Sequence, residues 1–409
     1  MDPDELSAFY QDLHRHPELA MREERTARLV AERLAGLGFE VTSGVGGTGV
    51  VGLLRNGDGP TALLRADMDA LPVQERTGLP YASTARGVDR AGHEVPVMHA
   101  CGHDVHVTCL LGACAELAER RDTWAGAVMA VFQPAEETGE GADAMIRDGL
   151  FERFGRPVVV LGQHVSPIPA GVLALRPGPA FAASDSLRVT LFGRGGHGSR
   201  PEACVDPVVM AAAVVMRLQT LVSRENAATD TAVVTVGSIH AGTAANIIPD
   251  EAELLLSVRT ADEAVRTRIL AGIERIVRAE AAASGADREP AVENLGAFPA
   301  VVNDGAAAAV TRPALEAVSG IVVDPGPVTG SEDVGMFATA AGVPCVYWLL
   351  GGADPAAFAG ATTVPEIAER VRALPSNHSP LFAPVIEPTL TIGVRALAAA
   401  ARVWLPRPA

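Results

Sequence analysis

Residues 99–106, HACGHDVH, place three histidines, a cysteine and an aspartate within eight positions of the chain. Thiolate and imidazole groups are ligands that zinc and related divalent ions prefer in proteins. On its own, a CGH sequence would be weak evidence for a metal site. The segment becomes informative only if the rest of the chain supplies further ligands that can reach Cys101 and His103.

Three later segments carry such ligands. FQPAEETGEGA contains Glu136 and Glu137 directly after an apolar run, PVVVLGQH ends at His164, and SNHSP contains His378. Because sites in open α/β sheets form beyond the carboxyl ends of the strands, we expect these segments to meet at one sheet edge. The predicted metal ligands are Cys101 and His103, in a loop before a helix, together with Glu137, His164 and His378.

This ligand set is larger than a single tetrahedral zinc requires. It predicts two divalent ions about 3.5–4 Å apart. Cys101 is the natural bridge, because a thiolate has the charge and the lone pairs to bind two cations. Zinc or manganese suits these ligands best, and cobalt or nickel can occupy such sites. Glu136, beside a ligand, is predicted to be the general base that takes a proton from a water held by the metals.

Other reactive side chains were weighed against structural roles. His93 and His240 are given none, and His14 and His16 in LHRHPEL are interpreted as structural rather than functional. A second group is expected to support the ligands from outside: His99, His106, Asp67 and Asp69. Cys109 and Cys114 occupy apolar positions of a helix and are expected to pack in the core.

Apolar strands that alternate with helices must position these residues. Continuous apolar runs at 126–133 and 157–164 are typical of strands buried on both faces. The class is therefore α/β, with a mostly parallel sheet covered by helices. The predicted strands are 39–43, 49–55, 61–67, 126–133, 157–164 and 344–350, and the predicted helices are 23–37, 105–119, 142–150, 305–318, 332–340 and 386–404.

The pattern changes near residue 180, where SLRVTLFGRG alternates apolar and polar residues. A helix at about 205–223, strands at 231–240 and 251–260 and a helix at about 263–283 follow, which resembles a ferredoxin-like insert. We therefore predict a discontinuous catalytic domain, residues 1–181 and 298–409, interrupted by a smaller α+β domain, residues 182–297.

Composition excludes several function classes. The net charge of −16 argues against nucleic acid. All 33 basic residues are arginine, which excludes Schiff-base lysine chemistry. The N-terminal residues lack the features of a secretory signal and no apolar run reaches about 18 residues, so we expect no membrane partner. Five irregularly spaced cysteines predict reduced thiols in the cytoplasm.

Nearly end to end, the chain resembles the di-metal amidohydrolases that include hippurate hydrolases, N-acyl-amino-acid deacylases and hydrolases of indole-acetyl–amino-acid conjugates. The motifs that carry the resemblance are LHRHPEL, LLRADMDALP, MHACGHDVHV, VFQPAEETGEGA, GRGGHGSRP, AGTAANIIPDEAEL, GSEDVGMF and NHSP. It implies the same five metal ligands and Glu136 as the base. It also implies that the insert is a lid that mediates dimerisation, so the expected state is a homodimer or a dimer of dimers.

The resemblance extends to three lid residues. It implies that His197 reaches the active site of the partner subunit and donates to the oxyanion, and that Asn246 and Arg259 grip the substrate carboxylate. The expected reaction is hydrolysis of the amide bond of an N-acyl amino acid, a small-molecule substrate. Two alternatives stay open: a dipeptidase or carboxypeptidase of the same mechanism, and a non-catalytic protein that only binds an acyl amino acid.

Overall fold

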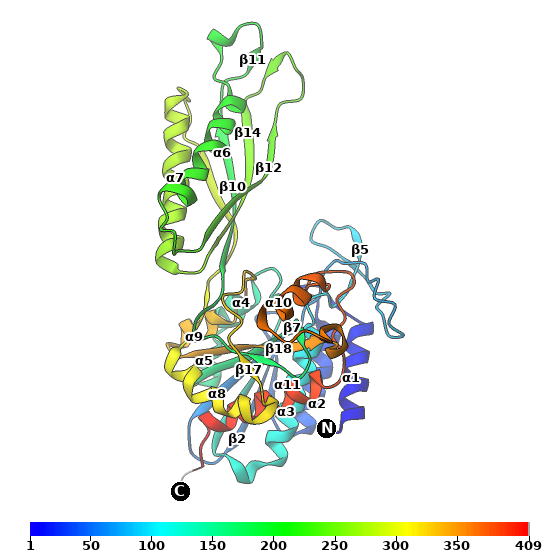
Figure 1. The fold of residues 1–409 in the computed structure, drawn as a ribbon. Helices are drawn as coiled ribbons and strands as arrows, with labels where there is room; N and C mark the ends of the chain where they lie inside the picture. The colour runs from blue at the N-terminus through cyan, green and yellow to red at the C-terminus, as the bar shows by residue number, and fades with distance from the viewer. Residues whose placement is uncertain (408–409) are drawn as a thin grey trace. The chain divides into compact units, whose positions relative to one another are not determined.

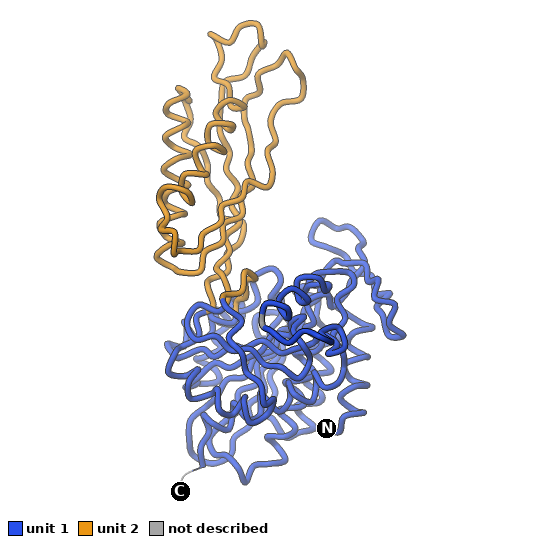
Figure 2. The backbone as a smooth tube through the Cα atoms, in the orientation of Figure 1, with its two compact units in different colours: residues 1–180, 302–326, 334–409 blue, residues 181–301, 327–333 orange. Residues whose placement is uncertain are grey.

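The computed structural model describes residues 1–407, which form two compact units (Figure 2). Unit 1 comprises residues 1–180, 302–326 and 334–409, and unit 2 comprises residues 181–301 and 327–333. Two short strands, β9 (Gly178–Phe181) and β16 (Val301–Asn303), lie near the points where the chain passes between the units.

Unit 1 is built on an eight-stranded sheet (Figure 1). Its order is β1-β2-β6-β3-β7-β18-β8-β17, and the four central strands, β6, β3, β7 and β18, are parallel. Antiparallel pairs lie toward both edges, at β1–β2, β2–β6 and β18–β8. The strands are β1 (Glu40–Val45), β2 (Gly49–Asn56), β3 (Thr61–Asp67), β6 (Gly126–Gln133), β7 (Val159–Pro169), β8 (Leu173–Ala174), β17 (Val322–Val323) and β18 (Cys345–Ala353).

Helices cover both faces of this sheet, as the apolar strands predicted. Val128, Ala130 and Phe132 of β6 face one core, which they share with α1, α2, α3 and α11, while Met129 and Val131 point to the other face and are also fully buried. On that second face α4 packs against β6 and α9 packs against β7. The helices of unit 1 are α1 (Pro3–Arg15), α2 (Glu24–Gly36), α3 (His103–Glu119), α4 (Gly141–Arg147), α5 (Leu150–Phe154), α8 (Gly305–Ser319), α9 (Gly335–Ala341), α10 (Val364–Ala373) and α11 (Thr389–Trp404).

Two boundaries next to the candidate ligands differ from the prediction. His103 is the first residue of α3 and does not lie in the preceding loop, because Gly102 adopts a left-handed conformation (φ 85°) and turns the chain directly into the helix. His164 does not end its strand, because β7 continues to Pro169 and pairs with β18 beyond that histidine.

Other elements were divided or not predicted. The helix expected at 142–150 is two helices, because Gly149 has a φ of 82° and interrupts it. The prediction missed α1, α10 and the hairpin of β4 (Arg86–Val88) and β5 (Glu94–Pro96).

Unit 2 is a four-stranded antiparallel sheet of order β12-β14-β10-β15, packed against two helices. The fourth strand, β15, was not predicted, and it completes the β-α-β-β-α-β order of a ferredoxin-like fold. The elements are β10 (Ala183–Phe192), α6 (Pro207–Arg224), β12 (Ala232–Ala241), β14 (Glu251–Thr260), α7 (Glu263–Ala283) and β15 (Ala291–Phe298), with a short ribbon of β11 (Gly196–His197) and β13 (Ile247–Ile248).

Helix α6 is buried on one face only. Met210, Val214 and Leu218 are fully buried, whereas Val209 and Met216 are 64% and 72% exposed. By length and composition alone, α6 is the one helix among the described residues that could cross a membrane. A single such helix is weak evidence, since its buried face belongs to the core of unit 2.

Candidate metal centre

The carboxyl ends of the central parallel strands bring the candidate residues of unit 1 together. Asp67 at the end of β3 is aligned with Gln133 at the end of β6, and His164 of β7 is aligned with Leu349 of β18. The loop that contains Glu136 follows β6 directly. The register of the sheet therefore collects these side chains at one edge, as open α/β sheets generally do.

Cys101 lies at the centre of the cluster. Its Sγ is 3.4 Å from Nε2 of His164. The ligand atoms of Cys101, His103 and His164 lie within 4.8 Å of one another, and those of Cys101, Glu137 and His378 do the same. Only Cys101 belongs to both triplets, so the geometry can accommodate two cations with one thiolate between them.

His103 is a buried imidazole without a geometrically sound hydrogen bond on either ring nitrogen. Its Nε2 lies 3.9 Å from carboxylate oxygens of both Glu136 and Glu137, and its Nδ1 lies 3.3 Å from Asp69 Oδ1. Burial lowers the pKa of His103, but nearby carboxylates, above all Asp67, outweigh it and raise the pKa to about 10. The surroundings therefore stabilise a positive charge at this point.

His164 is held in the tautomer that a metal ligand needs. Its Nδ1 donates to the carbonyl oxygen of Val165 (2.8 Å), which leaves the lone pair of Nε2 directed toward Cys101. Asn377 donates to the same carbonyl and to that of Cys101, both at 3.1 Å. The next residue, His378, has a positive φ of 71° and places Nε2 3.3 Å from Glu137 Oε2.

His106 lies near the cluster, but hydrogen bonds occupy both of its nitrogens. Its Nε2 accepts from the backbone N–H of Val165 (2.8 Å), so the ring carries its proton on Nδ1 and donates it to Asp67. Asp67 is also paired with the buried Arg65 (2.6 Å), which in turn donates to Gln133. Burial raises the pKa of Asp67, but the charge of Arg65 and the neighbouring histidines hold it well below its usual range.

Asp69 organises the loop that carries Glu136 and Glu137. Its two carboxylate oxygens accept the backbone N–H groups of these two residues, each at 3.0 Å. Glu136 is 5% exposed, and Oε1 of Glu137 is buried without a hydrogen-bond partner. Asp69, two residues beyond the end of β3, thus fixes the backbone of the predicted base and that of a predicted ligand.

The donor set fits two divalent cations. Burial, and then the charges of Glu137 and Glu136, raise the pKa of the Cys101 thiol well above its usual value, so a thiolate here needs a cation beside it. His103 and Glu137 each present a buried polar atom that the protein leaves unpaired, which is the condition a metal ion would relieve. Imidazole, thiolate and carboxylate donors together suit zinc and its neighbours.

The helix that begins at His103 is tied to α1 through a buried ion-pair network. His14 donates from Nδ1 to Asp104 (2.7 Å) and from Nε2 to Glu75 (3.1 Å), so both nitrogens carry protons. Burial lowers the pKa of His14, but the hydrogen bonds to Asp104 and Glu75 outweigh it and raise the pKa to about 9. His14 is therefore a buried imidazolium, which agrees with the structural role expected for it.

Replacement of His14 by glutamine should remove a pH-dependent part of the stability. Since the folded pKa is about 9 and the unfolded one 6.5, protonation of His14 stabilises the fold fully below pH 6.5, by about 3 kcal/mol, and this contribution is lost as the pH rises through 9. Urea unfolding of both proteins at pH 6 and pH 10 checks this. A difference in free energy of unfolding that stays constant between the two pH values would contradict it.

His99 belongs neither to the candidate metal cluster nor to the ion-pair network of His14. It is buried, neither ring nitrogen has a hydrogen-bond partner, and burial lowers its pKa to about 4. It is therefore a neutral imidazole behind the ligand loop. Asn377, the residue before His378, was not singled out in the sequence, although its position in NHSP was the available signal.

Unit 2 brings two of the three remaining candidates together. His197 is paired with Ile247 in the β11–β13 ribbon, and the next residue, Gly198, donates to the carbonyl oxygen of Asn246 (2.8 Å). Arg259 lies near the other end of β14, eight residues from Glu251 and thus about 26 Å along the strand. There its guanidinium donates to Thr329 O (2.9 Å) and Ser331 Oγ (3.0 Å).

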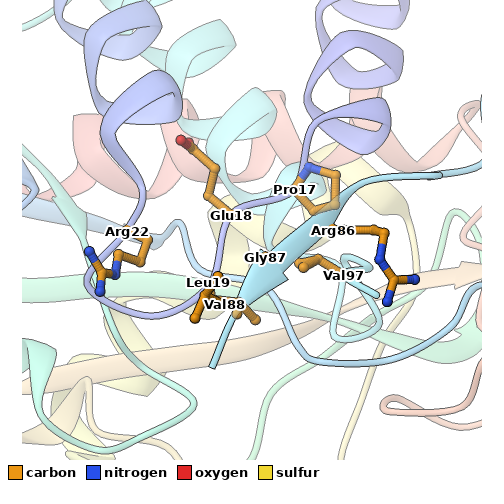
Figure 3. A pocket seen from close by; sticks show the side chains of 8 residues that line it. All are labelled: Pro17, Glu18, Leu19, Arg22, Arg86, Gly87, Val88 and Val97. Atoms are coloured by element: carbon orange, nitrogen blue, oxygen red, sulfur yellow. The ribbon is translucent and has the colours of Figure 1, made fainter. Parts of the chain in front are cut away.

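A separate pocket of about 510 Å³ lies beside the β4–β5 hairpin (Figure 3). The residues that line it include none of the candidate ligands, and they are Pro17, Glu18, Leu19, Arg22, Arg86, Gly87, Val88 and Val97. Glu18 uses its carboxylate for the first turn of α2, where it accepts from the backbone of Arg25 and Thr26. Glu18 therefore has a structural role in the wall of this pocket.

Known proteins share this organisation. Residues 63–374 match the sequence profile of Peptidase family M20/M25/M40. Thermostable carboxypeptidase 1 of Saccharolobus solfataricus is 39% identical over 347 residues, which cover 83% of this chain and 84% of that protein. Hippurate hydrolase of Campylobacter jejuni is 40% identical over 338 residues, which cover 81% of this chain and 85% of that protein.

A solved structure extends the similarity to the whole chain. The Bacillus subtilis YXEP protein, a dinuclear metal binding peptidase from the M20 family, aligns with a TM-score of 0.77 and 28% identity over 98% of each chain. Together with the two ligand triplets around Cys101, these matches make the protein a metal-dependent hydrolase. The chain belongs to peptidase family M20/M25/M40.

Proposed function

We propose that the protein hydrolyses the amide bond of N-acyl amino acids to a carboxylic acid and a free amino acid. The observation that carries the proposal is the pair of ligand triplets that share Cys101, with Glu136 beside them. The proposed ligands of two divalent metals, zinc or manganese in preference to cobalt or nickel, are Cys101, His103, Glu137, His164 and His378. When bound, such ions supply Lewis acidity, which acidifies water and polarises an acyl carbonyl.

Glu136 is proposed to move the proton. It takes a proton from the water molecule as the water oxygen attacks the acyl carbon, and it delivers that proton to the nitrogen as the C–N bond breaks. The products are a carboxylic acid and an amine, so one water molecule is consumed and the proton balance closes. Asp69 keeps Glu136 in place through the backbone N–H at 3.0 Å.

His197 is suited to stabilise the oxyanion. Its Nδ1 accepts from the backbone N–H of Ser199 (3.1 Å), so the neutral ring carries its proton on Nε2, where it can be donated. Such a donor typically contributes about 2.7–4 kcal/mol to catalysis. Arg259 and Asn246 are proposed to bind the substrate carboxylate, which a guanidinium can grip with two parallel hydrogen bonds.

The separation within unit 2 favours a homodimer or a dimer of dimers. His197 and Asn246 share one ribbon, whereas Arg259 lies near the far end of β14, about 26 Å along that strand from Glu251. One site can use all three if the ribbon comes from the partner subunit and the arginine from its own chain. We also propose a cytoplasmic location, since all five cysteines are free and four of them are buried.

A hydrolysis screen tests the proposed function. Purified protein loaded with zinc, manganese, cobalt or nickel should release amine from N-acetyl and N-benzoyl amino acids. Loss of the substrate carboxylate should reduce kcat/KM by about 10–100-fold, because a charged hydrogen bond of roughly 1.5–3 kcal/mol is lost. N-acyl amino acid amides are the matched control. Equal rates on acids and amides would contradict the role of the carboxylate, and a metal-loaded protein inert on every substrate would favour a non-catalytic binder.

A dipeptidase or carboxypeptidase is the second candidate. The similarity to a thermostable carboxypeptidase at 39% identity favours it specifically. Both activities use the same catalytic residues, so the substrate distinguishes them. Faster hydrolysis of dipeptides with a free α-amino group than of their N-acyl counterparts would identify the peptidase.

A further inference from the structure

The loop that carries Glu136 is held by two buried carboxylates. Asp69 accepts the N–H groups of Glu136 and Glu137, and Oε1 of Glu23 accepts the N–H of the preceding residue, Ala135, at 2.9 Å. Three consecutive backbone donors therefore end on carboxylate oxygens. Asp69 approaches from the end of β3, whereas Glu23 is separated from the loop by 112 positions in the sequence.

Glu23 contacts the loop at a strained residue. Among residues 1–407, positive φ outside glycine occurs at Met21 (60°), Ala135 (49°) and His378. This conformation costs an L-residue about 1–2 kcal/mol. Oε1 of Glu23 accepts from the backbone N–H groups of both Met21 and Ala135. One oxygen atom thus accepts from the backbone at two of the three residues with positive φ. The third, His378, is a proposed metal ligand.

Both carboxylate oxygens of Glu23 accept hydrogen bonds inside the fold. Its side chain is fully buried and its second oxygen accepts from the Thr48 hydroxyl. Where α4 begins, Gly141 lies against the carbonyl of Pro134, and a Cβ atom there would be only 1.6 Å from the oxygen. The loop therefore has little room to shift, and a backbone change at Ala135 would redirect the side chain of Glu136.

We propose that Glu23 is a positioning residue for catalysis: it holds Ala135 in the left-handed conformation that aims Glu136 into the metal centre. This inference rests on the proposed function, because it assumes that Glu136 is the base. Glu23 acts as an acceptor of backbone N–H groups, so an amide oxygen in its place can do the same. A side chain without an acceptor cannot.

Two substitutions separate these cases. Glu23→Gln keeps an oxygen for Met21 and Ala135 and can donate to Thr48, so kcat should stay within about threefold of wild type. Glu23→Leu keeps the volume of the side chain but has no hydrogen-bond acceptor. Its kcat should fall about 10–100-fold, because small misplacements of a reacting group cost about this much. KM should stay within threefold of wild type, and the protein should retain two metals. Equal loss in both variants would overturn the proposal.

A rescue variant, a hydrogen-exchange measurement and a control variant distinguish the positioning role from a general loss of stability. Ala135→Gly in the Glu23→Leu background removes the strain at residue 135, so it should recover at least threefold in kcat. Hydrogen exchange in the peptide 133–141 should be faster in Glu23→Leu than in wild type. Glu18→Ala is the matched control, since it weakens the same N-terminal segment by removing the bonds to Arg25 and Thr26 and should leave kcat within twofold.

Each outcome bears on one statement. If the wild-type protein hydrolyses acyl amino acids and Glu23→Leu keeps full kcat with unchanged exchange in 133–141, the positioning role is wrong and the proposed function stands. If Glu23→Leu does not fold, Glu23→Gln still decides, because a loss of more than tenfold in kcat would overturn the proposal. If the wild type hydrolyses none of the substrates, the proposed function itself fails. Hydrogen exchange in the peptide 133–141 then tests, without activity, whether Glu23 fixes the loop at Ala135.

Discussion

Replacement of Glu136 by glutamine should lower kcat on an N-acyl amino acid by about 10²–10⁴-fold, the range that a general base contributes. The substitution keeps the shape of the side chain and the backbone N–H bond to Asp69, but it removes the group that accepts the proton. The five proposed metal ligands are untouched, so elemental analysis should still find two metals per chain. Steady-state kinetics on the metal-loaded protein give kcat and KM separately.

Glu140→Gln is the matched control for this prediction. Glu140 belongs to the same segment but pairs with Arg90 at the surface, and it has no part in the cluster. Its replacement should leave kcat within about twofold. Normal turnover by Glu136→Gln would remove Glu136 as the base, and loss of metal in that variant would instead make it a ligand.

Glu136→Gln can also be used to test whether His197 acts in the site of the partner subunit. Subunits with Glu136→Gln and subunits with His197→Ala are each expected to be inactive. After subunit exchange, a mixed dimer would contain one site with both an intact Glu136 and an intact partner histidine. Recovery of activity after verified exchange is the expected result, and its absence would count against a shared site.

Much of this architecture could be predicted from the sequence, because its strongest signals are local. The apolar runs of β6 and β7 and the ligands near their carboxyl ends required only periodicity and the rule that sites form at that edge of the sheet. Weak local signals were missed: β8 and β17 have two residues each, too few to show alternation. The order of the strands in the sheet depends on tertiary pairing, which no segment shows on its own.

The residues that position the proposed ligands and base were harder to find in the sequence than the candidate ligands. Asp69 and Glu23 act on the loop of Glu136 through backbone N–H groups 67 and 112 positions away. These contacts depend on rotamers and on the left-handed conformation of Ala135, and alanine gives no sign of that conformation in a sequence. Asp69 could be placed near the metals, as the end of a strand, but its exact partners could not.

The difference between candidate ligands and positioning residues has a physical reason. The chemistry at a metal needs particular atoms, so ligand residues are restricted to a few types that stand out in a sequence. A backbone N–H can donate to any carboxylate, amide or carbonyl oxygen, so positioning residues carry no distinctive pattern. The positive φ values of Ala135 and His378 lie in the loops that carry the proposed base and one proposed ligand, and backbone strain tends to collect at functional sites.

Replacement of Cys101 by alanine should remove metal and activity together, in contrast to Glu136→Gln. Cys101 is the only residue that both ligand triplets contain, so its loss should weaken both sites at once. Removal of even a supporting group outside the ligand set typically costs 10–100-fold in metal affinity, so at least about 100-fold is expected here. Elemental analysis after dialysis should find fewer than two metals per chain, and kcat at limiting metal should fall at least as much.

Cys114→Ala is the matched control, because Cys114 is also a buried thiol but lies in the apolar core. It should lose some stability and keep both metals. Cys101→Asp should bind more metal than Cys101→Ala, since a carboxylate has two oxygens that can bridge two cations. If Cys101→Ala kept two metals, the thiolate could not be the bridge. The buried carboxylates of Glu136, Glu137 and Asp67 would then be the groups that bind the cations, with His103 and His164 completing the site.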